Sequence, residues 1–260
     1  MIRNLLIRGM VAGLVAGLIS FGFARGFGEP SVARAIAFEE QHEHAQAPAH
    51  DHHDEAAAAQ SHSHGDDEEL VSRDTQAGLG LLTGVVVFGT ALGGIFSLIF
   101  ALAYGRLGSL HARGTSVLLA LIGFVSVALV PFIKYPPNPP AVGNAETIGP
   151  RTALFFGMVA ISIVGAVFAV YAQRRLQARR GNWNAALIAA AGYVVLMVIA
   201  QVALPSVDEV PADFSASLLW NFRLTAVGIQ ALIWATLGLL FGALASRELE
   251  RPAARRMAAA

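Results

Sequence analysis

The chain contains no cysteine, and this absence narrows the chemistry that it can carry. Disulfide frameworks, thiolate metal sites and cysteine nucleophiles are all excluded. Charged side chains are also scarce, because only 14% of the 260 residues are Asp, Glu, Lys or Arg, against about 25% in an average soluble protein. Together with 55% hydrophobic residues, this composition excludes a disordered chain and argues against a soluble α/β enzyme.

Motifs of catalysis and nucleotide binding are absent as well. The sequence holds no phosphate-binding loop, dinucleotide fingerprint, HExxH helix or Ser/His/Asp arrangement. We therefore expect neither an enzyme nor a bound prosthetic group, and we expect no nucleic-acid partner.

Six stretches without a charged residue dominate what is present. They comprise residues 9–24, 75–105, 115–133, 152–172, 185–204 and 224–246. A transmembrane helix needs about 20 apolar residues, with a range of roughly 17–25, and five of the six stretches meet this requirement. The first is slightly shorter, but its flanking arginines can extend to the membrane interfaces. The sequence therefore predicts an all-α, polytopic membrane protein with six transmembrane helices in the lipid bilayer.

The uneven distribution of charge predicts the orientation of these helices. Twelve basic residues fall at the N-terminus, in the second and fourth connections and in the C-terminal tail, whereas the other connections hold five. Because Lys and Arg concentrate on the cytoplasmic side, we expect both termini to be cytoplasmic. Sixteen of the 18 acidic residues fall in the outer connections. The net charge of zero then results from an excess of negative charge outside the membrane and an excess of positive charge inside it.

These patterns divide the chain into four parts. Residues 1–27 are the first transmembrane helix, and residues 28–74 are an extracytoplasmic segment, rich in His and acidic residues and largely disordered after residue 41. Residues 75–246 form a five-helix bundle with a Pro-rich outer loop at 134–151, and residues 247–260 are a basic cytoplasmic tail.

The first segment has an alternative interpretation as a secretory signal, with a small-residue cleavage pattern at Ala35-Ile36-Ala37. Against cleavage, this pattern lies far beyond the apolar run. The glycines Gly9, Gly13 and Gly17 also follow a four-residue spacing that suits close helix packing in lipid. We therefore favour a retained helix.

Histidine is concentrated in the extracytoplasmic segment, where seven of the eight fall within 23 residues and among many carboxylates. Imidazole nitrogen and carboxylate oxygen suit divalent ions such as Co²⁺, Ni²⁺ and Zn²⁺. Because Ala and polar residues dominate between the histidines, we expect several weak, exchanging sites. The alternative is a solvated acidic linker with incidental histidines. The candidate metal ligands are His42, His44, His50, His52, His53, His62 and His64, with Glu39 and Glu40 at the junction with the first helix.

Polar residues near the predicted membrane helices form a second group of candidates. No Asp or Glu lies inside any of the six stretches, which argues against a proton-coupled antiporter. Four prolines make the outer loop rigid and extended, and Arg223 marks the outer boundary of the sixth helix or faces the bundle. A carboxylate on the same side, Asp213 or Glu29, is its expected partner. The candidates for the transport path or its gating are Asn138, Glu146, Asn221, Arg223 and Gln230.

With these residues assembled, the sequence resembles the CbtA family of predicted cobalt transporter subunits. The resemblance covers almost the whole chain, and its most specific part is the Pro-rich loop. It depends on LLIRG at 5–9, EP at 29–30, AI at 35–36, EE at 39–40, KYPPNPP at 134–140, ETI at 146–148, RT at 151–152 and WNFR at 220–223, with Gln230 and Trp234.

The resemblance implies a subunit for divalent cobalt uptake in the bacterial inner membrane, working with a small single-span partner called CbtB. The His- and acid-rich segment would capture the ion, and the helix bundle would provide its passage. Two alternatives stay open: a non-transporting subunit that delivers metal to a separate permease, and a transporter of nickel or zinc.

Overall fold

The computed structural model describes residues 2–46, 72–108 and 110–249, and all regular structure in these ranges is helical. The elements are α1 (Ile2–Phe23), η1 (Ala24–Gly28), α2 (Glu29–Gln46), α3 (Arg73–Thr75), η2 (Gln76–Gly80), α4 (Leu81–Ala103), α5 (Ala112–Gly123), η3 (Phe124–Leu129), α6 (Val130–Lys134), η4 (Ala145–Thr147), α7 (Ile148–Ala203), α8 (Ala216–Thr236), η5 (Leu237–Phe241) and α9 (Gly242–Leu249).

Neighbouring elements join into five helices that are long and apolar enough to cross a membrane. They are Ile2–His42, Arg73–Ala103, Ala112–Lys134, Ala145–Ala203 and Ala216–Leu249. Helix suits these apolar stretches because it satisfies every backbone hydrogen bond within one segment, which lipid itself cannot do. The all-helical class predicted from the sequence is confirmed for the described residues.

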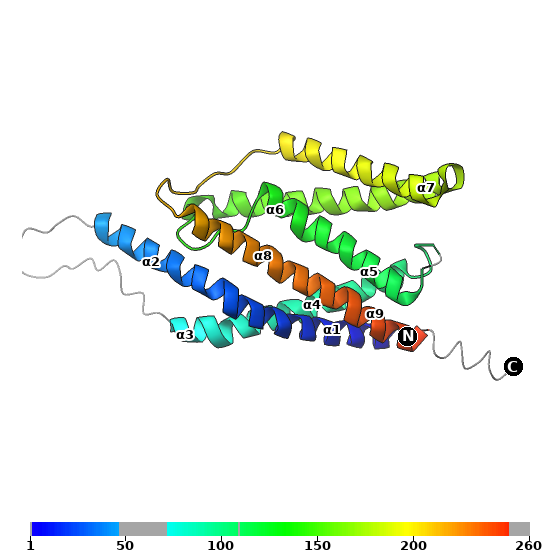
Figure 1. Cartoon of the computed structure of the whole chain (residues 1–260), viewed down its shortest axis with the longest axis horizontal. Helices are drawn as coiled ribbons and strands as arrows, with labels where there is room; N and C mark the ends of the chain where they lie inside the picture. The colour runs from blue at the N-terminus through cyan, green and yellow to red at the C-terminus, as the bar shows by residue number, and fades with distance from the viewer. Residues whose placement is uncertain (1, 47–71, 109, 250–260) are drawn as a thin grey trace, which may run out of the picture.

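The longest helix, α7, is bent back on itself at Gly181. The backbone there has φ 74° and ψ 166°, which is not helical, and Figure 1 shows two arms running in opposite directions from this point. Contacts join the arms, since the hydroxyls of Ser162 and Tyr193 lie 2.7 Å apart and Met197 packs against Gly165. Two of the six uncharged stretches, 152–172 and 185–204, therefore lie on separate arms of one helix.

Helices α1 and α4 pack closely along a glycine seam. A methyl group added at Gly13 would lie 2.1 Å from the carbonyl oxygen of Gly89, and one added at Gly93 would lie 2.1 Å from that of Gly9. Without side chains at these positions the two backbones approach each other directly, as small residues allow in membrane helices. The four-residue glycine spacing of the first helix is explained by this contact.

The first and last described helices, α1 and α9, are tied together at one end of the bundle. Arg8 of α1 donates to the Glu248 carboxylate and to the carbonyl of Leu244, both on α9. Asn4 also donates to Glu248, at 2.8 Å. We call this end, which includes the connection between α4 and α5 and the bend at Gly181, the α9 end (Figure 1).

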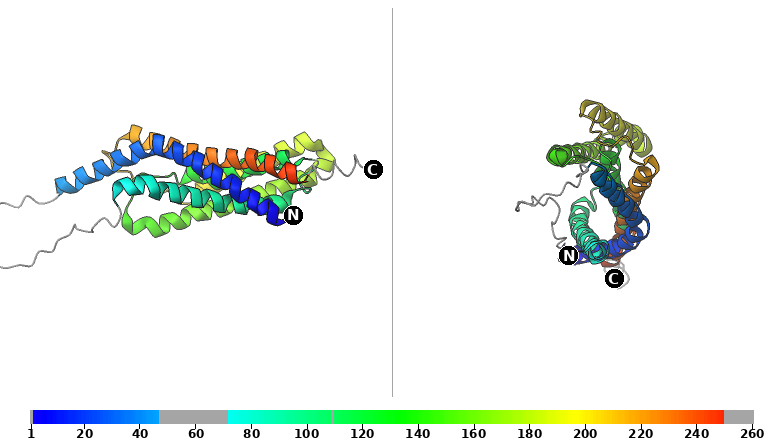
Figure 2. Two further views of the ribbon diagram at one scale, coloured as in Figure 1. Left: turned by 90° about the horizontal axis from the view of Figure 1, so that it is seen from below. Right: turned by 90° about the vertical axis from the view of Figure 1, so that its left-hand side faces the viewer.

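The opposite end carries the long loops, and we call it the α2 end. It holds α2, α3, the loop of residues 135–144 and the loop of residues 204–215 (Figures 1 and 2). Helix α2 continues α1 and η1 without a break, so the first helix runs on to Gln46. Seen end-on in Figure 2, the second arm of α7 lies at the opposite edge of the bundle from α4.

Candidate functional site

A pocket of about 480 Å³ opens at the α2 end, between the loops of residues 135–144 and 204–215. Three aromatic side chains, Phe132, Tyr135 and Phe155, form part of its wall. The remaining lining includes a balanced set of charges together with neutral polar groups. These polar residues are Asn138, Arg151, Thr152, Asp208, Glu209 and Arg223.

Local sequence explains how the first loop reaches the pocket. The prolines that follow Tyr135 hold residues 136–140 extended, and the Tyr135 hydroxyl donates to the carbonyl of Pro205 at 2.8 Å, joining the two loops. Asn144 then begins η4, because its side-chain oxygen accepts from the backbone N–H of Glu146 at 3.0 Å. Gly143 has φ 123°, and any side chain there would overlap the Arg151 guanidinium.

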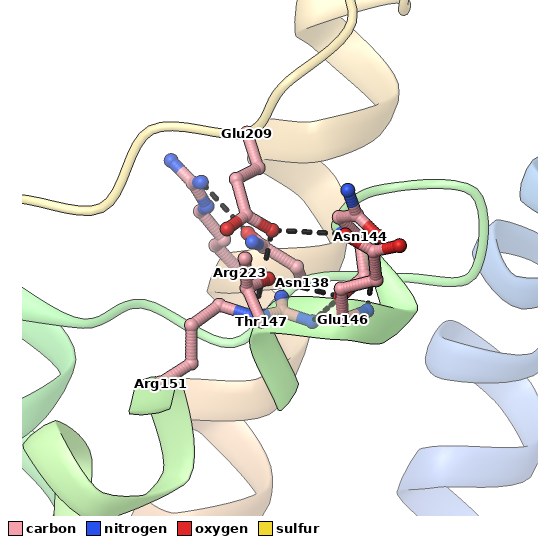
Figure 3. Close-up of polar contacts among 7 residues, drawn as sticks. All are labelled: Asn138, Asn144, Glu146, Thr147, Arg151, Glu209 and Arg223. Atoms are coloured by element: carbon pink, nitrogen blue, oxygen red, sulfur yellow. Dashed lines mark hydrogen bonds and ion pairs between the residues drawn. The ribbon is translucent and has the colours of Figure 1, made fainter. Parts of the chain in front are cut away.

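Arg223 and Asn138 meet in this pocket. Arg223 extends from α8, and one of its terminal nitrogens donates to the side-chain oxygen of Asn138 at 2.9 Å (Figure 3). The carboxylate of Asp208 lines the same pocket and interacts electrostatically with the guanidinium. The Nε of Arg223 is buried and has no hydrogen-bond partner among the described residues. The guanidinium is therefore hydrogen-bonded to one loop and attracted electrostatically by an acidic residue of the other.

Glu209 fastens the second loop to the start of α7. Its carboxylate accepts from the backbone N–H of Asn144 at 2.8 Å and lies 3.5 Å from the Nε of Arg151. Hydrogen bonds from the Thr147 hydroxyl and from Asn144, together with the Arg151 charge, hold the pKa of Glu209 below its usual value, although partial burial opposes them. The Glu209 carboxylate thus stays ionised and bound to Asn144 and Arg151, whereas Asp208 beside it is exposed to solvent.

The sequence-based candidates separate into those inside and those outside the pocket. Asn138 and Arg223 are brought together, as described above. Glu146 contributes a backbone N–H to the Asn144 cap, and its side chain is exposed. Asn221 is exposed, and Gln230 is half-buried further along α8. Neither these two residues nor Glu146 line the pocket.

The expected carboxylate partners of Arg223 are bound elsewhere. Glu29 pairs with Arg73, and Asp213 contacts His42. The reason is the depth of Arg223, which lies eight residues after the N-cap Ser215 and hence about 12 Å along the helix. At that depth the nearest loops supply Asn138 and Asp208 instead.

The histidine candidates are only partly covered by the described residues. His42 lies on α2, and its ring nitrogen Nε2 is 2.5 Å from a carboxylate oxygen of Asp213. Glu39 and Glu40 are exposed on the same helix. His44 belongs to α2, but its side chain lies outside the description, as do His50, His52, His53, His62 and His64. Within the described residues, no group of three or more His, Asp or Glu could hold a metal ion.

Sequence reasoning did not select Arg151, Asp208 and Glu209, which complete the pocket. A signal for two of them was present, because residues 208–213 hold three carboxylates in a chain whose acidic residues are otherwise concentrated in the His-rich segment. What the sequence could not supply was the contact between this loop and Asn144, 65 positions earlier.

These features define a membrane-embedded helical protein with a pocket of mixed charge at one end of its bundle. The family model for CbtA, described as a probable cobalt transporter subunit, matches residues 2–246. The chain belongs to this family, and the resemblance drawn from its motifs is confirmed. A transporter subunit is not a class of enzyme. Neither a curated protein nor a solved structure matches the chain.

Proposed function

We propose that this protein is a six-span subunit of a divalent cobalt uptake system in the bacterial inner membrane, with both termini in the cytoplasm. The charge distribution supports the orientation, because the arginines of the fourth connection, residues 174–180, and Arg247 of α9 belong to the α9 end. The bend of α7 at Gly181 supports the sixth span, since it divides a 56-residue helix into two antiparallel arms. The α2 end then faces the outside.

The outer face collects the ion in this proposal. The histidines and carboxylates of residues 39–69 raise the local concentration of Co²⁺, both as ligands and through their negative charge. The pocket at the α2 end receives the ion beside Asp208, while Arg223 and Asn138 organise its mouth without touching the cation. A small single-span partner, CbtB, acts with this subunit. From the pocket, the ion passes through the helix bundle.

The observation that carries the proposal is the family match across residues 2–246, which includes all or nearly all of each apolar helix. Its test is the accumulation of ⁵⁷Co²⁺ in cells that carry or lack the gene. We expect accumulation at submicromolar Co²⁺ only in cells with the gene. Equal accumulation in both would overturn the proposal.

The capture role of the histidines needs its own variant, which we call the six-His variant. It replaces His44, His50, His52, His53, His62 and His64 with Asn and keeps His42 and every carboxylate. A matched control replaces Ala47, Ala49, Ala56, Ala57, Ala58 and Ala59 with Asn. We expect the six-His variant to lose uptake at scarce Co²⁺ and recover it at high Co²⁺, whereas the control behaves as wild type. Unchanged uptake at every concentration would contradict capture.

Transport and delivery are distinguished with purified protein in liposomes, with and without the single-span partner. Co²⁺ flux in either preparation supports a conducting subunit. Absence of flux in both, combined with gene-dependent accumulation in cells, supports delivery of the metal to a separate permease. Competition by Ni²⁺ and Zn²⁺ in the same assay tests which ion is preferred.

A further inference from the structure

The outer part of α2 is anchored on the loop that precedes α8. Phe38 packs edge-on against Phe214, with ring centroids 5.0 Å apart, and Ala35 and Phe214 belong to one buried apolar cluster with Val142. One turn later, the ring of His42 lies against that of Phe38 at 4.1 Å. The imidazole is therefore held between its own helix and the loop, with its Nε2 directed at Asp213.

The hydrogen-bonding pattern around His42 restricts what can lie between it and Asp213. Nδ1 is 3.2 Å from the carbonyl oxygen of Phe38, which only accepts, so Nδ1 carries a proton. Nε2 is 2.5 Å from a carboxylate oxygen, another acceptor. If the imidazole is neutral, a lone pair on Nε2 faces the carboxylate. Atoms this close have room only for a shared proton between them, so a cation can take the place of that proton only where the contact opens.

The same pattern is the one found around metal-binding histidines. Such a histidine donates its second ring N–H to a backbone carbonyl, which fixes the tautomer and directs the free nitrogen at the metal. An imidazole nitrogen and a carboxylate oxygen are both ligands suited to borderline divalent ions. Here the two ligand groups come from separate elements, α2 and the loop of residues 204–215, and meet at the outer surface.

We propose that His42 and Asp213 are the two protein ligands of an exchangeable Co²⁺ site, formed where α2 packs on the loop before α8. The proposal rests on the proposed function, because its ligand is the cargo of that function. Two ligand atoms on one ion lie about 3 Å apart, so the observed contact must open slightly to admit it. The side chains of His42 and Asp213 are 41% and 60% exposed, so the surrounding packing leaves space on the solvent side for this opening. Water completes the coordination, which makes the site exchangeable.

The position of this site gives it a role between capture and the pocket. Asp213 lies on the same loop as Asp208 and Glu209, which line the pocket. Val210 also lines the pocket and packs against the apolar cluster beneath Phe38. An ion bound by His42 and Asp213 is therefore held by the same loop that lines the pocket, and by the helix that leads into the His-rich segment.

The test measures Co²⁺ binding to full-length protein in detergent by equilibrium dialysis with ⁵⁷Co²⁺. The six-His variant serves as the parent, because it removes the tract histidines and keeps His42. We expect Asp213→Asn to weaken Co²⁺ binding by roughly tenfold or more, the least effect expected for a lost ligand. His42→Gln should have the same effect, and the double variant should be no weaker than either single one. Asp74→Asn, an exposed carboxylate at the same end, should leave binding unchanged.

Asp213→His separates a metal site from a plain ion pair. Histidine is itself a metal ligand, so Asp213→His should bind Co²⁺ as the parent does. Histidine is not an anion, however, and so cannot replace the carboxylate in an ion pair with an imidazolium. Failure of this variant to bind Co²⁺, or equal binding by the parent and Asp213→Asn, would overturn the proposal. Loss of gene-dependent uptake in cells with binding at this site intact would instead reject the proposed function and leave the site standing.

Discussion

Gly13 and Gly22 lie on the same helix but in different surroundings. A methyl group at Gly13 would overlap the carbonyl oxygen of Gly89 on α4, whereas one at Gly22 would meet nothing within 4 Å. We expect Gly13→Ala to destabilise the protein by on the order of 1–3 kcal/mol, because two backbones must separate. Gly22→Ala should be neutral or slightly stabilising, since Ala is the better helix former. Thermal unfolding midpoints in detergent compare the two, and equal midpoints would contradict the close α1–α4 contact.

Glu209 gives the protein a defined response to acid. Its pKa in the folded protein lies below the ordinary value because of Thr147, Asn144 and Arg151. The ionised carboxylate therefore contributes stability that is fully present above the unfolded-state pKa, about 4.3, and is lost as the pH falls through the lower folded-state pKa. We expect Glu209→Gln to lower the unfolding midpoint at pH 7.

The difference between Glu209→Gln and wild type should then shrink as the pH falls below about 4. Unfolding midpoints measured between neutral and strongly acidic pH test this expectation. Glu146→Gln is the matched control, because its side chain is exposed in the same part of the molecule. A constant difference at every pH would mean that the carboxylate charge is not what matters.

For single residues, the sequence indicates candidates by their unusual positions, but it does not indicate which residues they contact. Asn138 is unusual because it lies between prolines, and Arg223 is unusual because it lies at the edge of an apolar stretch. Both residues line the pocket. Their contact joins residues 85 positions apart, and no local pattern reports such a separation. For the same reason the sequence offers Asp213 or Glu29 as the partner of Arg223, whereas in the structure they contact His42 and Arg73.

Among the elements, α7 depends on one glycine for its shape. Gly181 has φ 74° and ψ 166°, a region of backbone conformation that is essentially restricted to glycine. We expect Gly181→Ala to cost on the order of 1–3 kcal/mol, with no contribution from crowding, because a methyl group there meets nothing within 4 Å.

Gly157→Ala is the control for this prediction. Gly157 lies on the first arm of α7 and is equally uncrowded, but its backbone is helical, so the change should not destabilise the protein. Thermal unfolding in detergent measures both variants. If they behave alike, the turn between the two arms does not require glycine at position 181.

Hydrophobic stretches predicted the helices well because length and apolarity alone decide whether a segment suits a membrane. Each of the six stretches lies on, or within two residues of, a described helix. The end of the first helix was harder to place. The segment that follows the apolar run is polar, since it contains Glu29, Arg34, Glu39 and Glu40. The helix nevertheless continues as α2 to Gln46, because Phe38 and Ala35 pack against Phe214. Tertiary contact, which the sequence does not display, sustains this extension.

For the whole molecule, orientation and span number are linked predictions. Six spans with cytoplasmic termini require α7 to cross the membrane twice, with its bend on the side of α9. Because the sequence contains no cysteine, a single introduced cysteine can report on which side of the membrane its position lies. Ala145 and Ser206 flank α7 at the α2 end, and Ala178 lies close to the bend. All three side chains are exposed.

A membrane-impermeant maleimide should therefore label Ala145→Cys and Ser206→Cys in intact spheroplasts, and Ala178→Cys only after lysis. The physical reason is the concentration of arginines beside the bend, at positions 174, 175, 179 and 180, because such clusters are retained on the cytoplasmic side. Labelling of all three in intact cells would mean that α7 does not cross twice. The opposite pattern, with only Ala178→Cys labelled, would invert the molecule and turn the pocket, His42 and Asp213 toward the cytoplasm. Capture of external Co²⁺ at the α2 end would then be untenable.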